Sequence, residues 1–264
     1  MSQRLMLGWA NMSRFQIPTV VAVVLSALLA LVGVVGVAQS QNSETIPGAA
    51  GEFYFSRLAY QNAQGMGGWR GGSWTTDYPD AEYHLLGGLS RLTRIATAAD
   101  GVIVSLDNDD LMNYPWLYAV EVGRWYLSDA EAARLREYLL RGGFLMVDDF
   151  WGTYQWAVFL ESMKRVFPGR PIIEIPEGDP LLHVLYDLDQ RIQIPGRSLT
   201  WEQDGDTPHW RGIYDDQDRL MVAINFNMDM GDAWEHADDA WYPEPMTALA
   251  YRFAVNYVIY SMTH

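Results

Sequence analysis

Short apolar runs alternate with helical segments along residues 52–264 of this 264-residue chain. The run at 102–106 is uninterrupted, which is typical of a strand buried on both faces of a parallel sheet. The apolar runs of strand length are 53–57, 102–106, 144–147 and 171–175. The helical segments are 80–95, 128–139, 155–166 and 245–262. This alternation predicts a three-layer α/β domain, with a mostly parallel sheet and helices on both of its faces.

Two local patterns support these boundaries. Ser128 and Glu131 have the spacing of a capping box, which marks the first turn of a helix. Gly142 follows the end of that helical segment, as expected for a C-terminal cap.

Residues 212–224 indicate a hairpin that turns at 215–218.

A long apolar stretch precedes the domain. Residues 15–43 contain no charged side chain, and as a helix the stretch 18–37 would span roughly 30 Å, the thickness of a hydrocarbon core. The length favours an uncleaved signal anchor over 15–38. The alternative is a cleaved signal peptide, because the small residues Gly36 and Ala38 suit a cleavage site.

Both alternatives predict the same location for the domain. Arg4 and Arg14, in residues 1–14, hold the N-terminus in the cytoplasm. Residues 39–264 are therefore expected in the cell envelope, on the periplasmic or extracytoplasmic side, with the membrane as a partner. Residues 39–51 form a polar linker.

Composition excludes several classes of function. The chain has 18 Lys and Arg against 33 Asp and Glu, a formal net charge of −15, which argues against nucleic acid as a partner. It contains no cysteine, so disulfides, thiol nucleophiles and cysteine-ligated metals are ruled out. No phosphate-binding loop and no flavin, NAD or haem motif is present. A divalent cation is the one cofactor that the acidic residues suggest.

Acidic side chains follow two of the predicted strands. Asp107 and Asp109 come after the run 102–106, while Asp148 and Asp149 come after the next apolar strand. Parallel strands end at the same edge of a sheet, so both groups are expected there. Adjacent carboxylates can bind a hard cation or share a proton. The alternative is that one aspartate caps the next helix and the other is solvated.

A second group of candidates lies at the start of the helical segment 80–95. Asp77 precedes Pro79, and four-residue spacing places Asp80 and His84 on one helix face. A carboxylate and an imidazole can ligate a metal or act as an acid–base couple, with Glu82 as a second carboxylate. A surface ion pair is the alternative.

Two further segments attract attention. Residues 225–239 are rich in Asn and Asp but lack the spacing of an EF-hand, which favours a solvated acidic loop. Trp69, Trp74 and Trp151 fall on predicted loops or element ends, as do two later tryptophans. Exposed aromatic rims stack on sugars or peptides. Alternatively, large aromatic side chains fill gaps beneath long loops.

Six motifs together resemble a known bacterial family, that of domain of unknown function 4159. They are Phe53-Tyr-Phe-Ser-Arg-Leu-x-Tyr60, Trp74-Thr-Thr-Asp-Tyr-Pro-x-Ala-Glu-x-His84, Gly88-Leu-x-Arg-Leu-Thr-x-Ile95, Arg141-Gly-Gly-Phe-Leu-x-x-Asp-Asp-Phe-Trp-Gly152, Val166-Phe-Pro168 and Ala250-Tyr-Arg-x-x-Val-Asn-Tyr257. The resemblance implies a fold similar to flavodoxin-like and class I glutamine-amidotransferase-like domains. It also implies that such domains occur fused or adjacent to membrane proteins with von Willebrand-type domains. The chain has no cysteine that could act as the nucleophile, and this absence excludes the glutaminase activity of amidotransferases.

These observations favour a non-catalytic binding or scaffold module of the cell envelope, with a glycan or an envelope protein as partner. Its cleft is expected between residues 65–76, 107–114 and 148–151, with ligand-binding side chains at Trp69, Trp74, Asp77, Asp107, Asp109 and Trp151. The alternative is a carboxylate- or divalent-metal-dependent hydrolase acting on a carbohydrate-like substrate. Its catalytic residues would be Asp148, Asp149, Glu82 and His84.

Overall fold

The computed structural model describes residues 52–66 and 72–264. The chain divides into residues 1–47 and 48–264, and all described residues belong to the second unit. The predicted membrane span and Trp69 lie outside the described residues. Within the described ranges, no helix combines the length and the apolar character needed to cross a membrane.

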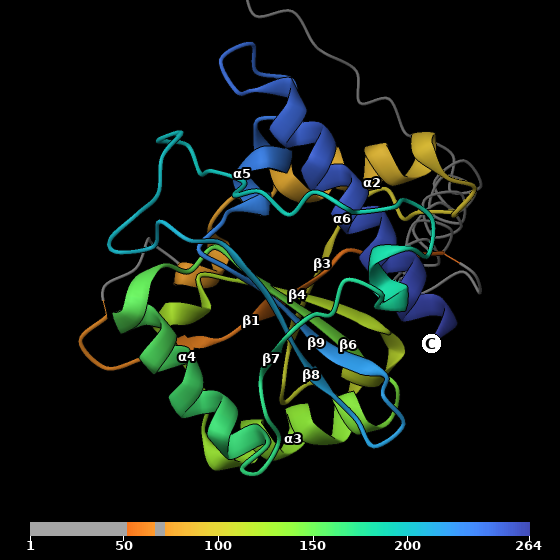
Figure 1. The fold of residues 1–264 in the computed structure, drawn as a ribbon. Helices are drawn as coiled ribbons and strands as arrows, with labels where there is room; N and C mark the ends of the chain where they lie inside the picture. The colour runs from red at the N-terminus through yellow and green to blue at the C-terminus, as the bar shows by residue number, and fades with distance from the viewer. Residues whose placement is uncertain (1–51, 67–71) are drawn as a thin grey trace, which may run out of the picture. The chain divides into compact units, whose positions relative to one another are not determined.

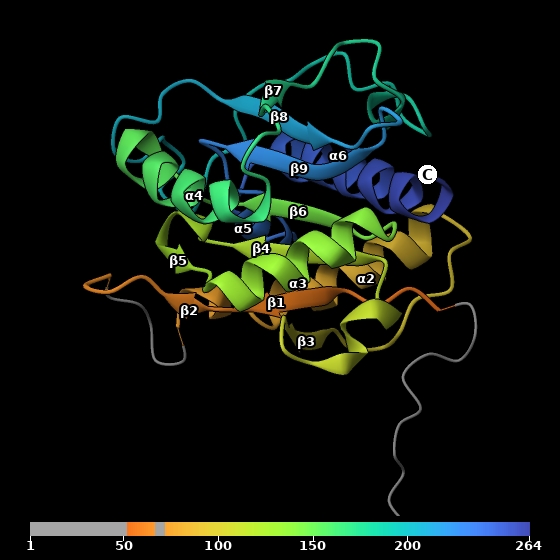
Figure 2. The ribbon, with the colours of Figure 1, turned by 90° about the horizontal axis from the view of Figure 1, so that it is seen from below.

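A seven-stranded sheet forms the centre of the domain (Figure 1). Its strand order is β3-β1-β4-β6-β9-β8-β7, which Figure 2 shows edge-on. The five parallel strands are β1 (Ser56–Ala59), β3 (Val102–Ser105), β4 (Trp116–Val120), β6 (Phe144–Asp148) and β9 (Leu220–Phe226). The strand β8 (His209–Tyr214) runs antiparallel to β9 and to β7 (Ile173–Glu174). A separate pair joins β2 (Gln61–Asn62) to β5 (Trp125–Tyr126).

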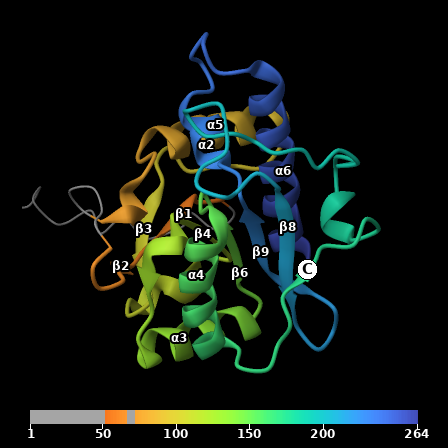
Figure 3. The same cartoon turned by 60° about the vertical axis from the view of Figure 1, so that its left-hand side comes forward.

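Helices cover both faces of the sheet, as the sequence predicts. On one face, α2 (Asp80–Leu92), α5 (Met230–Glu235) and α6 (Glu244–Thr263) pack beside one another (Figure 3). The other face carries α3 (Asp129–Leu140) and α4 (Gly152–Val166). Short 3₁₀ helices are η1 (Ser73–Thr75), η2 (Asp109–Asn113), η3 (Val122–Arg124) and η4 (Pro180–Leu182).

The first four residues of β6, 144–147, are all apolar because the strand is covered on both faces. Phe144 and Met146 pack into the core under α6, whereas Leu145 and Val147 pack into the core under α3 and α4. Alternate side chains point to opposite faces, so a central strand needs an apolar residue at every position. The capping box of Ser128 is present at the start of α3, and the predicted hairpin is β8–β9.

Three strand predictions need correction. The run at 102–106 forms β3, an edge strand whose Ile103 is 45% exposed, because it pairs with β1 alone. The first strand begins at Ser56 rather than Phe53, which makes only an isolated bridge to Thr97. The fully buried strand β4, absent from the sequence prediction, occupies the position next to β6.

Candidate functional site

The carboxyl ends of β1, β4, β6 and β9 surround a cleft of about 630 Å³. β3 lies on one side of β1, and the later strands β4, β6 and β9 lie on the other side. The connections that leave β1 and β3 therefore run in opposite directions, and the strand order reverses between β1 and β4. Ligands of α/β proteins bind at such a point. The cleft is lined by Thr75, Thr76, Asp77, Tyr78, Glu121, Asp149, Arg197, Glu202, Asp229, Asp232 and Glu235.

Asp148, the last residue of β6, is fully buried beneath this cleft. Its Oδ2 accepts hydrogen bonds from the backbone N–H groups of Met230 and Gly231, at 2.7 and 3.0 Å, and from the Tyr118 hydroxyl at 3.2 Å. Asp148 therefore caps the first turn of α5, which is distant in sequence, and not the helix that follows it. Its other oxygen, Oδ1, is buried and makes no hydrogen bond.

Asp149 lines the cleft directly. Its backbone has a left-handed conformation, with φ of 49°, which turns the chain sharply after β6. The indole Nε1 of Trp151 donates to Asp149 Oδ1 at 2.8 Å. Trp151 is 1% exposed, so it orients this carboxylate instead of offering a stacking surface as expected.

Asp77 faces the cleft from the segment between η1 and α2. Its side chain does not cap α2, whose N-cap residue is Pro79, and its buried Oδ2 makes no hydrogen bond. A Cβ atom at Gly231 would lie 2.1 Å from this oxygen. The first turn of α5 thus approaches Asp77 so closely that only glycine fits.

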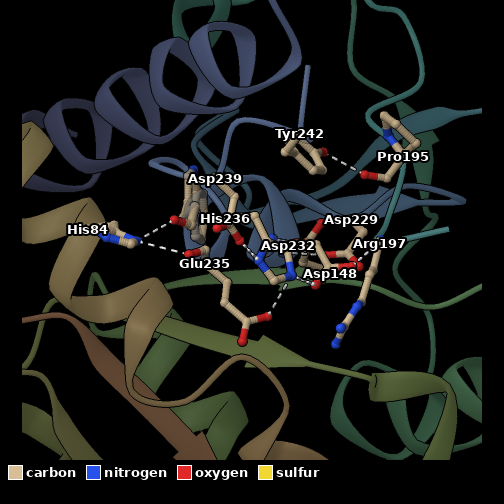
Figure 4. A network of polar contacts seen from close by, with 12 residues as sticks. His84, Asp148, Pro195, Arg197, Asp229, Asp232, Glu235, His236, Asp239 and Tyr242 are labelled. Carbon is tan, nitrogen blue, oxygen red and sulfur yellow. Dashed lines mark hydrogen bonds and ion pairs between the residues drawn. The ribbon is translucent and has the colours of Figure 1, made fainter. Parts of the chain in front are cut away.

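The predicted acidic loop at 225–239 is largely buried and contains α5. Asp229 caps this helix, because its Oδ1 accepts from the N–H of Asp232 at 2.7 Å. Asp232 in turn accepts from the N–H of Arg197. Asp232, Glu235 and His236 bring possible metal-ligand atoms within 4.8 Å of one another (Figure 4).

Burial changes the acidity of the carboxyl groups in and under the cleft. Desolvation raises the pKa of Asp148 to about 7, although the hydrogen bonds to its Oδ2 oppose the shift. Burial and the charge of Asp232 hold the pKa of Asp77 well above its usual value. The pKa values of Asp149 and Asp229 are raised for the same reason, with neighbouring carboxylates adding to the effect. Burial therefore favours the protonated form of several carboxyl groups in and under the cleft.

The two other proposed catalytic residues lie outside the cleft. Glu82 is buried in an ion pair with Arg57, in which Nη2 donates to Oε2 at 3.0 Å. The ring of His84 binds the carbonyl oxygens of Trp234 and Glu235, with Nδ1 at 2.8 and 3.0 Å. Both side chains therefore fasten α2, one to β1 and the other to α5. The expected partnership of Glu82 and His84 with Asp148 and Asp149 is not formed.

The acidic residues after β3 are also outside the cleft. Asp107 and Asp109 are exposed, and Asp109 lies 3.9 Å from Arg134 of α3. They follow a strand that ends at the same edge as β6, as predicted. Two strands stand between β3 and β6, however, which separates the two ends by roughly 14 Å. Trp74 packs against the core, and its carbonyl accepts from Arg57 at 3.1 Å.

Several cleft residues are not predicted as site residues by the sequence. Glu121 directly follows β4, a strand that the sequence does not predict. Asp229 and Asp232 have oxygen-ligand character, but with Glu235 they belong to the segment 225–239, whose spacing favours a solvated loop. Arg197 and Glu202 come from the long connection between β7 and β8, which has no periodic pattern.

Comparison with known families agrees with the motifs in the sequence. Residues 55–262 match a family described as a domain of unknown function (DUF4159). The chain belongs to the DUF4159 family. The matched range includes the described sheet, the helices on both faces and every residue that lines the cleft. No protein with a curated function matches the chain.

Proposed function

We propose that this DUF4159 domain is a binding module whose cleft holds a positively charged ligand, such as a basic segment of an envelope protein or an amino sugar. The observation that carries the proposal is the charge of the cleft. Seven acidic side chains line it, and among the described residues Arg197 is the only basic side chain in the lining. A cationic ligand favours the ionised form of these carboxyl groups, so an ammonium or guanidinium group gains charge-assisted hydrogen bonds, whereas an anionic ligand is repelled.

The shape and position of the cleft support binding. Its volume of about 630 Å³ is within the range of pockets that hold small molecules or short segments. Tyr78 lines it and is 44% exposed, which offers a ring face to a cation or a sugar. The strand order of the five parallel strands, second-first-third-fourth-fifth, is that of flavodoxin-like sheets, which bind ligands at this edge. An envelope location rests on the N-terminal apolar stretch alone.

Binding can be tested with charged probes in the presence of a chelator. We expect the purified chain to bind a short Arg/Lys peptide and a glucosamine oligomer, and not a Glu-rich peptide or the N-acetylated oligomer, in calorimetric titrations at low salt. Asp149→Asn combined with Glu202→Gln should weaken binding about tenfold or more, because two carboxyl groups that would pair with the cation are lost. Asp107→Asn is the matched control, because Asp107 is exposed outside the cleft. Equal binding of the acidic probes would refute the proposal.

A carboxylate-dependent hydrolase is the second candidate, and one observation favours it. Asp149 lines the cleft and burial holds its pKa well above its usual value, whereas Glu202 of the same lining is exposed. Two carboxyl groups in such different environments can act as acid and base. Hydrolysis of cell-wall oligosaccharides that is lost in Asp149→Asn, with binding retained, would favour this candidate over a binding module.

A further inference from the structure

One histidine next to the cleft residue Glu235 has an unusual environment. His236, the C-cap residue of α5, is 9% exposed, and its Nδ1 lies 2.9 Å from Asp239 Oδ2. Its other ring nitrogen, Nε2, is buried and makes no hydrogen bond. That nitrogen lies 3.3 Å from Oε2 of Glu235 and 3.7 Å from Oδ1 of Asp232. Figure 4 shows the three side chains meeting at one place beside α5.

We propose that Asp232, Glu235 and His236 bind a divalent transition metal ion of the Zn²⁺ class. The helix supplies the spacing, because residues three and four apart lie on one face. Atoms that ligate one ion at about 2.1 Å are roughly 3–3.5 Å apart, and the two distances from Nε2 to the carboxylate oxygens are close to this value. Small side-chain rotations would complete the site.

The surrounding hydrogen bonds prepare these groups for a metal. If Nδ1–H donates to Asp239, the lone pair of the ring is on Nε2, the form that ligates metals, and a carboxylate partner of this kind orients many ligating histidines. The Arg197 N–H occupies Oδ2 of Asp232, which leaves Oδ1 directed toward His236. Trp241, 4.6 Å from the imidazole between ring centres, covers it on one side.

The donor set indicates which ions fit. One imidazole and two carboxylates suit Zn²⁺, Co²⁺ or Mn²⁺, whereas Mg²⁺ and Ca²⁺ prefer oxygen ligands alone. Three protein ligands leave coordination positions open toward the cleft, because Asp232 and Glu235 both line it. Asp232 and Glu235 also line the cleft, so the ion is titrated alone and the charged probes are titrated with a chelator, which measures the two sites separately.

Calorimetric titration of the metal-free chain with Zn²⁺, without peptide or sugar, tests the site. We expect one ion per chain, with Mg²⁺ at least about tenfold weaker. His236→Gln and Glu235→Gln should each weaken Zn²⁺ binding at least tenfold, and Asp239→Asn by about 10–100-fold. With Co²⁺, the His236 ring protons should show large paramagnetic shifts in NMR spectra.

His183→Gln is the matched control. His183 also contacts an aspartate four residues away, Asp187, at 2.8 Å, but on an exposed surface where the described part of the chain offers no third ligand. Its variant should bind Zn²⁺ as the parent chain does. Absence of saturable Zn²⁺ binding would overturn the proposal, and so would unchanged binding in folded His236→Gln. If circular dichroism shows that this variant does not fold, Glu235→Gln decides the question in the same way.

Discussion

At the scale of single residues, Asp148 combines a structural role with a raised pKa. It ends the central strand β6, and its buried Oδ2 caps α5, whose first residues follow β9. Three hydrogen bonds to one oxygen compensate part of the desolvation cost of the carboxylate. The second oxygen lacks a partner, so burial prevails and raises the pKa of Asp148 to about 7.

This raised pKa predicts how stability depends on pH. Between about pH 4 and about pH 7, Asp148 is protonated in the folded chain and ionised in the unfolded chain. Folding then takes up a proton, so this group stabilises the fold on the acid side of the window and less as the pH rises, by up to about 1.4 kcal/mol per pH unit. Asp77, Asp149 and Asp229, with pKa values shifted in the same direction, strengthen the trend.

We expect Asp148→Asn to reduce this pH dependence, because asparagine does not titrate. Urea unfolding of both chains between about pH 4.5 and 7.5, with a chelator present, measures it. Asp107→Asn, at an exposed position, should leave the dependence unchanged. A stability of the parent chain that increases steadily with pH across this window would contradict the prediction.

At the scale of secondary-structure elements, Arg57 and Glu82 connect β1, α2 and the cleft wall. Arg57 is fully buried, pairs with Glu82, and donates through Nη1 to the carbonyl oxygens of Trp74 and Thr76, at 3.1 and 2.8 Å. Thr76 lines the cleft. The pair therefore holds in place the segment that carries Asp77.

Glu82→Gln should destabilise the fold by about 3–5 kcal/mol, because it leaves the buried guanidinium without a counter-charge. Chemical denaturation measures the change. In the matched control Glu137→Gln, the partners Arg134 and Arg141 are on the surface of α3, and the expected loss is below about 1 kcal/mol. A variant Glu82→Gln with parental stability but without ligand binding or hydrolysis would instead support the functional role first expected for Glu82.

At the scale of the whole molecule, acidic side chains from distant parts of the sequence lie together at one edge of the sheet. The formal net charge of the chain is −15, and seven acidic side chains converge on one cleft. They come from the ends of β4 and β6, from α5, and from the connections before α2 and before β8. Parallel strands bring these ends together although the residues span much of the sequence.

The N-terminal segment leads to a prediction about where residues 1–264 are found after expression. If residues 15–38 form a signal anchor, the chain should remain with the membrane fraction after an alkaline wash when expressed in bacteria. Removal of residues 1–38 should release the domain to the soluble fraction. A soluble periplasmic product that begins at Gln39 would instead identify a cleaved signal peptide, and recovery of the intact chain in the cytoplasm would contradict both alternatives.

Local sequence patterns were sufficient to predict the elements that depend on neighbouring residues in the chain. The capping box of Ser128 forms within one helical turn, and the apolar run 144–147 is apolar at every position because both its faces are covered. The α/β class follows from the alternation of such elements. The presence of Asp148 and Asp149 at the carboxyl edge follows from the strand before them.

The pairing order of the strands and the membership of the cleft required the tertiary structure. An apolar run such as 102–106 does not specify which strands pair with it. In the structure this run forms the edge strand of the sheet, so Asp107 and Asp109 lie far from Asp149. The six residues of α5 are too few for helical periodicity to be evident. Their burial depends on Asp148 and on contacts with α2 and α6, which are remote in the chain. Long-range packing therefore decided which carboxylates meet.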